Sequence, residues 1–265
     1  MIKAKKKFGQ NFLKDDIFTD KIIQSMPKDN LRVVEIGPGL GDLTKKLVIH
    51  KEVTAFEIDD DLCQVLRSTL SSHIEEGRLD LKCTDVLEYW QKKSLMDQHY
   101  NLVANLPYYI ATKIVLKLLK DDNCHNILAM LQKEVAEKFC AKPNDKEFGY
   151  LSIIAELSGD SEILFDVPAE YFDPPPKVTS SFLQIKKRSS LVGEKGYFKT
   201  DSEFEKFEKF IRVSFANPRK TLKKNLSFYG KESLVSHFDR LNIEPNTRPH
   251  QLSSLKYLEL FKLIA

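Results

Sequence analysis

The sequence has few of the residues that mark zinc-bound, secreted or membrane-spanning proteins. Only four cysteines occur in 265 residues, at positions 63, 83, 124 and 140, and no two form a Cys-x-x-Cys pair. This spacing gives neither a zinc ribbon nor a dithiol redox motif, so we expect buried free thiols in a reducing compartment and no metal site. No apolar stretch of signal-peptide length follows the basic N-terminus, and no segment could span a membrane. We therefore expect a cytoplasmic protein without a membrane partner.

The chain also lacks a large net charge, but its basic residues are unevenly placed. Its 41 basic residues are nearly balanced by 38 acidic ones, which gives a net charge of +3. Residues 1–14 nevertheless carry five lysines and no acid, and residues 213–229 carry four basic residues and no acid. Two such stretches on a balanced chain favour a polyanion-binding face, although either one alone is as typical of a solvated surface segment.

Strand and helix patterns alternate over the first part of the chain. Runs rich in β-branched and apolar residues predict strands at 31–36, 52–58, 79–83, 100–106 and 126–131. Strands that are apolar on both faces and alternate with helical segments are typical of an α/β fold with a covered parallel sheet. Two later segments, 162–168 and 177–186, have the pattern of edge strands joined by a loop.

The composition changes after Arg188. A polar, glycine-bearing stretch follows, and beyond it apolar residues recur at helical spacing at positions 204, 207, 210, 211 and 215. We therefore expect an α/β domain over residues 1–190 and a small all-helical domain over residues 191–265.

The segment "EIGPGLGDL" places glycines at 37, 39 and 41 after the first predicted strand. A dinucleotide fold would have Gly-x-Gly-x-x-Gly there, with a pyrophosphate at the helix N-terminus. Here the third glycine comes one residue early, and Asp42 would repel a phosphate. The motif better suits a ligand without phosphates, such as S-adenosylmethionine.

Two acids end the next predicted strands. Glu57 comes 20 residues after Gly37, where an acid can bind ribose hydroxyls, and Asp85 follows the third strand, where a carboxylate could accept from an adenine amine. Either acid alone is also typical of a surface charge or a helix cap. Because ligands bind at the carboxyl edge of parallel sheets, the features together favour a cofactor site.

The segment "NLPYYI" follows the fourth predicted strand and suggests chemistry on an exocyclic adenine amine. That amine is a poor nucleophile, because its lone pair is delocalised into the ring. The side-chain oxygen of Asn105 and a backbone carbonyl near Leu106 or Pro107 could accept its hydrogens and direct the lone pair at a methyl donor. Pro107 fixes the local backbone, and Tyr108 offers a face for a flipped-out base. The competing interpretation is a strand-ending turn with a core tyrosine.

These motifs occur together in the order found in one known family. The chain carries, in sequence, "FGQNFL", "EIGPGLGDLT", "FEIDDDL", "TDVL", "NLPYYI", "QKEVAEK", "YFDPPPKVTSSF" and "FANPRKTLKKNL". It thereby resembles the ribosomal RNA adenine dimethyltransferases over nearly its whole length, and most closely the bacterial small-subunit branch. The resemblance implies a Rossmann-like S-adenosylmethionine-dependent methyltransferase domain followed by a helical RNA- or ribosome-binding domain.

The resemblance also implies a substrate and roles for particular residues. It implies methyl transfer to two adjacent adenosines near the 3′ end of 16S rRNA, late in small-subunit assembly, by a protein that we expect to be a monomer. The implied cofactor-binding residues are Asn11, Leu13, Gly37, Glu57, Asp85 and Asn105, and the implied catalytic residues are Asn105, Pro107, Tyr108 and Phe172, the last as a second aromatic against the base. We expect RNA contacts from the basic residues Lys5, Lys6, Lys7, Arg219, Lys220, Lys223 and Lys224, the last four on one face of a helix that begins at Pro218.

The chain departs from the family pattern at three positions. Ala104 stands where glycine is frequent, Tyr109 where asparagine is common, and Pro218 where many members have arginine. A methyl group at 104 should be tolerated, whereas the basic cluster is one charge lighter because of Pro218.

Four other functions remain as alternatives. They are an assembly protein that binds rRNA without catalysis, a methyltransferase of large-subunit rRNA, a DNA adenine methyltransferase, and a nicotinamide dehydrogenase. The complete "NLPY" motif argues against loss of catalysis, and the long helical tail with "RKTLKKNL" favours the small-subunit branch. The glycine spacing disfavours the dehydrogenase.

Overall fold

The structure, a computed structural model, describes residue 5, residues 8–91 and residues 94–264. Internal contacts divide the chain into two compact units, the first formed by residues 1–136 and 162–188 and the second by residues 137–161 and 189–265. Residues 137–161, which the predicted boundary at 190 assigns to the first domain, therefore lie in the second unit. The functions expected of the two domains stay predictions.

The strands match the predicted segments closely and include further short pairings. They are β1 (Phe12–Leu13), β2 (Arg32–Ile36), β3 (Val53–Glu57), β4 (Leu79–Cys83), β5 (Tyr100–Asn105), β6 (Cys124–Gln132), β7 (Gly159–Val167), β8 (Phe172–Asp173) and β9 (Ser180–Lys187).

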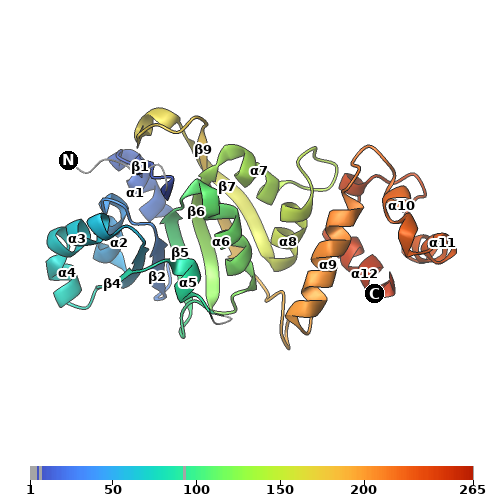
Figure 1. The fold of residues 1–265 in the computed structure, drawn as a ribbon, viewed down its shortest axis with the longest axis horizontal. Coiled ribbons are helices and arrows are strands. Elements are labelled where there is room, and N and C mark those ends of the chain that lie inside the picture. Colours follow the sequence, from blue (N-terminus) through green and yellow to red (C-terminus); the bar gives the residue numbers. More distant parts are fainter. Residues whose placement is uncertain (1–4, 6–7, 92–93, 265) are drawn as a thin grey trace. The chain divides into compact units, whose positions relative to one another are not determined.

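Seven of these strands form one sheet in the order β4-β3-β2-β5-β6-β9-β7 (Figure 1). Strands β2 to β6 are mutually parallel, and β9 joins β6 in antiparallel orientation. The predicted α/β, Rossmann-like fold is confirmed. The prediction of two edge strands was wrong for β9, which lies between β6 and β7 and is buried along most of its length. Residues 180–185 have no charge, so they can be covered on both faces.

The helices alternate with the strands and then continue alone. They are α1 (Asp16–Ser25), α2 (Asp42–His50), α3 (Asp60–Thr69), α4 (Ser71–Glu75), α5 (Val86–Tyr89), α6 (Tyr108–Lys120), α7 (Lys133–Cys140), α8 (Tyr150–Ser158), α9 (Asp201–Ser214), α10 (Leu222–Asn225), α11 (Lys231–Arg240) and α12 (Ser254–Ile264), with short 3-10 turns at Ala169–Tyr171, Ser227–Tyr229 and Pro249–Gln251. None of the described helices is long and apolar enough to cross a bilayer.

The core of the first unit lies between the sheet and its helices. Ile22 of α1, Leu47 of α2 and Leu66 of α3 are fully buried against strand residues such as Val33 and Val103. Burial of such side chains contributes about 1.5–3 kcal/mol each, and it holds the carboxyl ends of β2, β3, β4 and β5 at one edge of the sheet. The functional site is built at that edge.

The second unit has an aromatic core of its own. Phe198 packs against Phe204 and Phe207, and Phe210 and Phe261 continue the cluster. Phe204, Phe207 and Phe210 lie on α9 at positions of the predicted helical stripe. The helices α12 and α8 pack beside α9.

Candidate cofactor and adenine site

A single pocket opens at the carboxyl ends of β2 to β5, within the first unit. Its cavity has a volume of about 290 Å³. The lining brings together all six residues predicted to contact the cofactor, which are Asn11, Leu13, Gly37, Glu57, Asp85 and Asn105. Of the predicted catalytic residues, Pro107 and Tyr108 also line it. The predicted glycine loop, acids and "NLPY" segment therefore share one cavity.

The glycine loop owes its shape to backbone conformations that favour glycine. Gly37, Gly39 and Gly41 have φ angles of +75°, +62° and +85°. A β-carbon on Gly39 would lie 2.8 Å from Cδ1 of Phe12, and one on Gly37 would lie 3.4 Å from Cδ of Pro107. The loop thus packs directly against the N-terminal segment and the start of α6, where a side chain would intrude.

Glu57 links this loop to the end of β3. Its side chain is 4% exposed, and its Oε2 accepts from the Gly39 amide over 3.1 Å. Its Oε1 accepts from the Asp59 amide over 2.9 Å. Burial raises the pKa of Glu57, which these backbone bonds oppose. Glu57 therefore shapes the loop as well as facing the pocket.

Asp85 caps a helix and also lies at the pocket, so its contact with the cofactor stays a prediction. Its side chain caps α5 by accepting from the Leu87 amide over 2.7 Å, and the residue also lines the pocket. The backbone amide of its neighbour Thr84 donates a hydrogen bond of 2.8 Å to the Glu57 carbonyl. The ends of β3 and β4 are thus held together beside the cavity.

Asn105 ends β5 and binds the N-terminal segment. Its Nδ2 donates to the backbone carbonyl of Asn11 over 3.0 Å. Asn11 in turn donates from Nδ2 to the Gly9 carbonyl over 3.1 Å. With its nitrogen engaged in this way, Asn105 keeps its Oδ1 as an acceptor for a ligand.

The start of α6 distinguishes the two carbonyls that the sequence offered as acceptors. The Pro107 carbonyl accepts from the amides of Ile110 and Ala111, at 3.1 and 3.0 Å, and so serves the first turn of the helix. A carbonyl oxygen has two lone pairs, and both of those on Pro107 are used by these amides. The Leu106 carbonyl is therefore favoured as the second acceptor beside Asn105. Pro107 has φ −59° and forms the N-cap of α6.

The Tyr108 ring is anchored at its far end. Its hydroxyl shares a hydrogen bond with Oγ of Ser180, a buried residue at the start of β9. Burial raises the pKa of Tyr108, and the Ser180 bond opposes that rise. The ring is therefore neutral at physiological pH and held in place from outside the pocket.

Glu35 is a buried acid that the sequence analysis did not identify. It lies on β2, is 2% exposed and lines the pocket. Burial and nearby Glu57 raise its pKa, the Thr44 hydroxyl lowers it by donating over 2.7 Å, and the net pKa is about 8. Its position before the first glycine was the available signal.

Phe172 packs in the core of the first unit, whereas Asn105, Pro107 and Tyr108 line the pocket. It is 3% exposed, packs in the core cluster with Phe18 and Phe182, and pairs through β8 with Leu13 of β1. It is not among the described residues that line the pocket. Its contact with a base stays a prediction.

Lys5, one of the N-terminal lysines expected to contact RNA, is paired with protein carboxylates. Lys5 forms ion pairs of 2.6 Å with both Asp59 and Asp61, which raise its pKa. It fastens the N-terminal segment to α3 and is engaged by protein carboxylates. Lys6 and Lys7 lie outside the described residues.

The basic cluster of the second unit is not on one helix. The prediction that a helix starts at Pro218 was wrong. The Lys220 amide donates to the Asn217 carbonyl and so forms a turn, and α10 begins only at Leu222. Thr221 caps α10 by accepting from the Lys224 amide, which fixes the later start. The turn and the short helix together present the basic side chains, with Arg219, Lys220 and Lys224 exposed and Lys223 half-buried.

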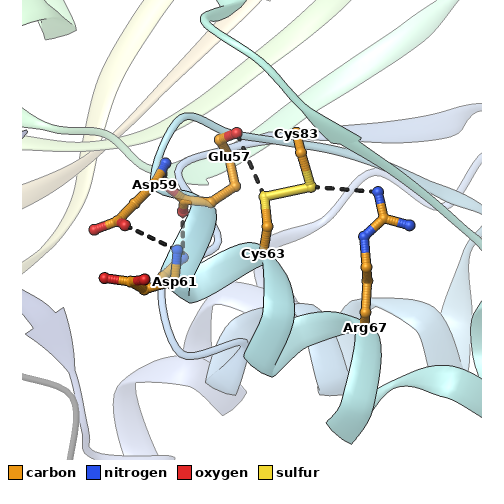
Figure 2. Close-up of a disulfide and its surroundings, with 7 residues drawn as sticks. Glu57, Asp59, Asp61, Cys63, Arg67 and Cys83 are labelled. Carbon is orange, nitrogen blue, oxygen red and sulfur yellow. Dashed lines mark hydrogen bonds between the residues drawn. A yellow bond between two sulfur atoms is a disulfide. The ribbon is translucent and has the colours of Figure 1, made fainter.

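A disulfide joins Cys63 of α3 to Cys83 at the end of β4, as Figure 2 shows. Cys63 and Cys83 have their Cα atoms 6.1 Å apart, within the usual range, and Arg67 lies 3.6 Å from the Cys83 sulfur. The prediction of four free thiols was wrong for this pair, because β3 and β4 are neighbours that bring the two residues together. A reducing compartment was expected because all four cysteines were taken to be free, and the disulfide removes that reason.

The charge of the pocket is of one sign. The acidic lining residues are Glu35, Asp42, Glu57 and Asp85, and no lysine, arginine or histidine lines it among the residues that the structure describes. Because the pKa of Glu35 is about 8, this residue keeps its proton near neutral pH, and the negative charge comes from the other acids. Such a cavity disfavours phosphate and favours a ligand that carries positive charge.

Comparison with known proteins shows the relationships of the chain. The family model described as "Ribosomal RNA adenine dimethylase" matches residues 1–265. A protein of Campylobacter concisus (strain 13826) named ribosomal RNA small subunit methyltransferase A is 51% identical over an alignment of 265 residues. The alignment covers 99% of this chain and 95% of that protein. A protein of Aliarcobacter butzleri (strain RM4018) with the same name is 54% identical over 263 residues, 98% of this chain and 96% of that one.

Solved structures support the fold. A dimethyladenosine transferase from Plasmodium falciparum matches with a TM-score of 0.77 at 24% identity, over 94% of this chain and 95% of that one. The 23S rRNA methyltransferase ErmE matches with a TM-score of 0.70 at 23% identity, over 96% of this chain and 99% of that one.

Proposed function

The chain belongs to the ribosomal RNA adenine dimethylase family, and on that premise we propose its substrate, cofactor and site. It transfers methyl groups from S-adenosylmethionine to the exocyclic amines of two adjacent adenosines near the 3′ end of 16S rRNA. The relatives named ribosomal RNA small subunit methyltransferase A support the choice of subunit. We further propose that the protein acts as a monomer in the cytoplasm, late in small-subunit assembly.

The acid-lined pocket fits the proposed cofactor. S-adenosylmethionine carries a sulfonium and an ammonium group but no phosphate, and the described lining offers carboxylates without a basic side chain. Asn11, Leu13 and Gly37 would hold its methionine end, Glu57 its ribose and Asp85 its adenine. When bound, the cofactor supplies an electrophilic methyl group. This match of pocket charge and ligand charge is the observation that carries the proposal.

Asn105 would orient the target amine. Its Nδ2 is fixed by the Asn11 carbonyl, so its Oδ1 is a preorganised acceptor for one amine hydrogen. The Leu106 carbonyl would accept the other hydrogen, since the Pro107 carbonyl serves α6. Two acceptors draw the amine toward a tetrahedral geometry with a directed lone pair. The methylated amine is acidic enough to lose its proton to solvent, so no general base is needed.

Tyr108 would hold the flipped base by stacking. Its ring is positioned by the Ser180 bond, and stacking on an aromatic ring is worth about 1–3 kcal/mol per base. Phe172 would give the second aromatic only if its core packing opened. The unstacking of the adenine costs a few kcal/mol, which contacts elsewhere must offset.

We propose that the basic cluster formed by Arg219, Lys220, Lys223 and Lys224 offsets this cost by neutralising phosphates. Replacing all four with Glu should leave cofactor binding unchanged, weaken binding to small-subunit particles, and flatten its dependence on salt. Isothermal titration and filter binding at several salt concentrations would measure this. A salt slope equal to that of the wild type would remove the cluster from the interface.

Calorimetry tests the cofactor site directly. The wild type should bind S-adenosylmethionine and not NAD, and Glu57→Ala should weaken binding by roughly 1–3 kcal/mol through the loss of charged hydrogen bonds. Since Glu57 also holds the Gly39 amide, Glu57→Gln is the matched variant, because its side-chain oxygen can keep that bond. Unchanged affinity in both variants would place the ribose elsewhere.

A further inference from the structure

Tyr109 is a large aromatic residue at the rim of the pocket. It is the second residue of α6, and its side chain lines the cavity although the residue is 58% exposed. A single exposed aromatic is ordinary on a protein surface, but this one lines the cavity as well. It stands where asparagine is common in the family.

The ring rests against the backbone of the N-terminal segment. Gly9 has φ +59°, and a β-carbon on it would lie 3.1 Å from Cδ1 of Tyr109. A side chain at position 9 would therefore push against the ring. The same segment is fixed on its other side, because the Asn11 carbonyl accepts from Asn105 and the Gly9 carbonyl accepts from Asn11. Tyr109 and Asn105 thus hold residues 9–11 from two sides.

Tyr109 lines the same cavity as the two acids Asp85 and Glu57. Burial raises the pKa of Tyr109, and the carboxylates of Asp85 and Glu57 raise it further. These acids end β4 and β3, whereas Gly9 belongs to the N-terminal segment. Tyr109 therefore lines one cavity together with the N-terminal segment, which it contacts at Gly9, and with the acids that follow or end β4 and β3.

We propose that Tyr109 is a cofactor-binding residue, whose ring covers the adenosine end of bound S-adenosylmethionine and couples that binding to the order of residues 8–13. The inference rests on the proposed function, in which Asp85 and Glu57 hold the adenosine. A ring that lines the same cavity as these acids can offer its face to the purine or ribose and shield their hydrogen bonds from water. An asparagine at this position could not cover the same area.

The test uses S-adenosylhomocysteine as the probe, with calorimetry and hydrogen exchange as the readouts. Tyr109→Asn should weaken binding about 10-fold, and Tyr109→Phe, which keeps the ring, should stay within about threefold of the wild type. Binding to the wild type should protect the amides of residues 8–13 from exchange, and this protection should be reduced in Tyr109→Asn. Phe228→Asn, which removes an exposed aromatic of the second unit, is the control and should bind as the wild type does.

Gly9→Ala sharpens the test through a double-mutant cycle. Alone it should weaken binding by displacing the ring and by straining the backbone at φ +59°. Its effect should shrink when combined with Tyr109→Asn, because the displaced ring is then absent and only the backbone strain remains. Additive effects would contradict the coupling. Thermal unfolding confirms that each variant is folded, and Tyr109→Leu replaces Tyr109→Asn if the latter is unstable.

The outcomes separate this inference from the proposed function. If the wild type does not bind S-adenosylhomocysteine, the proposed function fails. If the wild type binds and Tyr109→Asn binds equally well, with equal protection of residues 8–13, the role of Tyr109 alone is overturned.

Discussion

The side-chain nitrogen of Asn105 donates a hydrogen bond of 3.0 Å to the backbone carbonyl of Asn11. This bond joins the end of β5 to the N-terminal segment, two parts of the pocket that are 94 residues apart in sequence. It determines which way the carboxamide faces, and so leaves an oxygen acceptor for the target amine. The proposed chemistry depends on that orientation.

Asn105→Ala should abolish turnover while the protein remains folded. The substitution removes the acceptor for the amine, together with one hydrogen bond worth about 1 kcal/mol of stability. Asn126→Ala is the matched control, because it also removes an asparagine donor from the sheet, the 2.8 Å bond to Asn101, but lies outside the pocket lining. Methyl transfer and thermal unfolding should be measured for both. Equal activities would exclude Asn105 from the reaction.

Tyr108→Phe should keep much of the activity, whereas Tyr108→Ala should lose about 10-fold or more. Stacking needs the ring, and the hydroxyl only anchors that ring to Ser180. Ser180→Ala removes the same anchor from the other side and should match Tyr108→Phe in methyl-transfer rates. If Phe and Ala at position 108 were equally damaging, stacking would not be the role of Tyr108.

Glu35 should make the stability of the protein fall as the pH rises. Its pKa in the folded protein is about 8, above its ordinary value of 4.5, because burial penalises the carboxylate. The folded state thus holds the proton more tightly than the unfolded chain, and stability is lost between about pH 4.5 and pH 8, by at most about 1.4 kcal/mol per pH unit. Glu35→Gln keeps an acceptor for Thr44 and should be more stable than the wild type at pH 8 but similar at pH 5. Denaturant unfolding curves that differ by a constant amount at all pH values would contradict this.

Reduction of the Cys63–Cys83 disulfide should destabilise the protein. The bond closes a loop across a sequence separation of 20 residues, and such a crosslink contributes about 2–4 kcal/mol. Cys63→Ser should show the same loss without a reductant, and a reductant should then have no further effect. Thiol titration of the unfolded wild type should find two thiols before reduction and four after it. Four thiols without a reductant would show that the pair does not form.

The sheet was largely predictable because its signals are local. The runs from Arg32 to Ile36 and from Val53 to Glu57 are apolar and β-branched over the length of a strand, and glycines or acids mark their ends. The place of β9 was not predictable, since it depends on long-range pairing with β6. The start of α10 was misjudged because Pro218 reads as a first helical residue, whereas the Thr221 side chain provides the cap.

The part of the pocket that consists of motifs at strand ends was predictable from the sequence. Gly37, Glu57 and Asp85 each follow a recognisable strand, so their meeting at one edge follows from the fold. The contacts of Lys5 with Asp59 and of Cys63 with Cys83 were not predictable from the sequence. They join residues whose proximity depends on how β3, β4 and the N-terminal segment pack. The same holds for Tyr109 and Gly9, whose contact requires the folded N-terminal segment.

Mass spectrometry of rRNA tests the central claim most directly. Undermethylated small subunits, large subunits and DNA are each incubated with the protein and S-adenosylmethionine, and the nucleic acid is then digested and analysed, with Asn105→Ala as the inactive control. The account predicts dimethyladenosine at two neighbouring positions near the 3′ end of 16S rRNA and none with Asn105→Ala. Methylation confined to large-subunit RNA or DNA would contradict it.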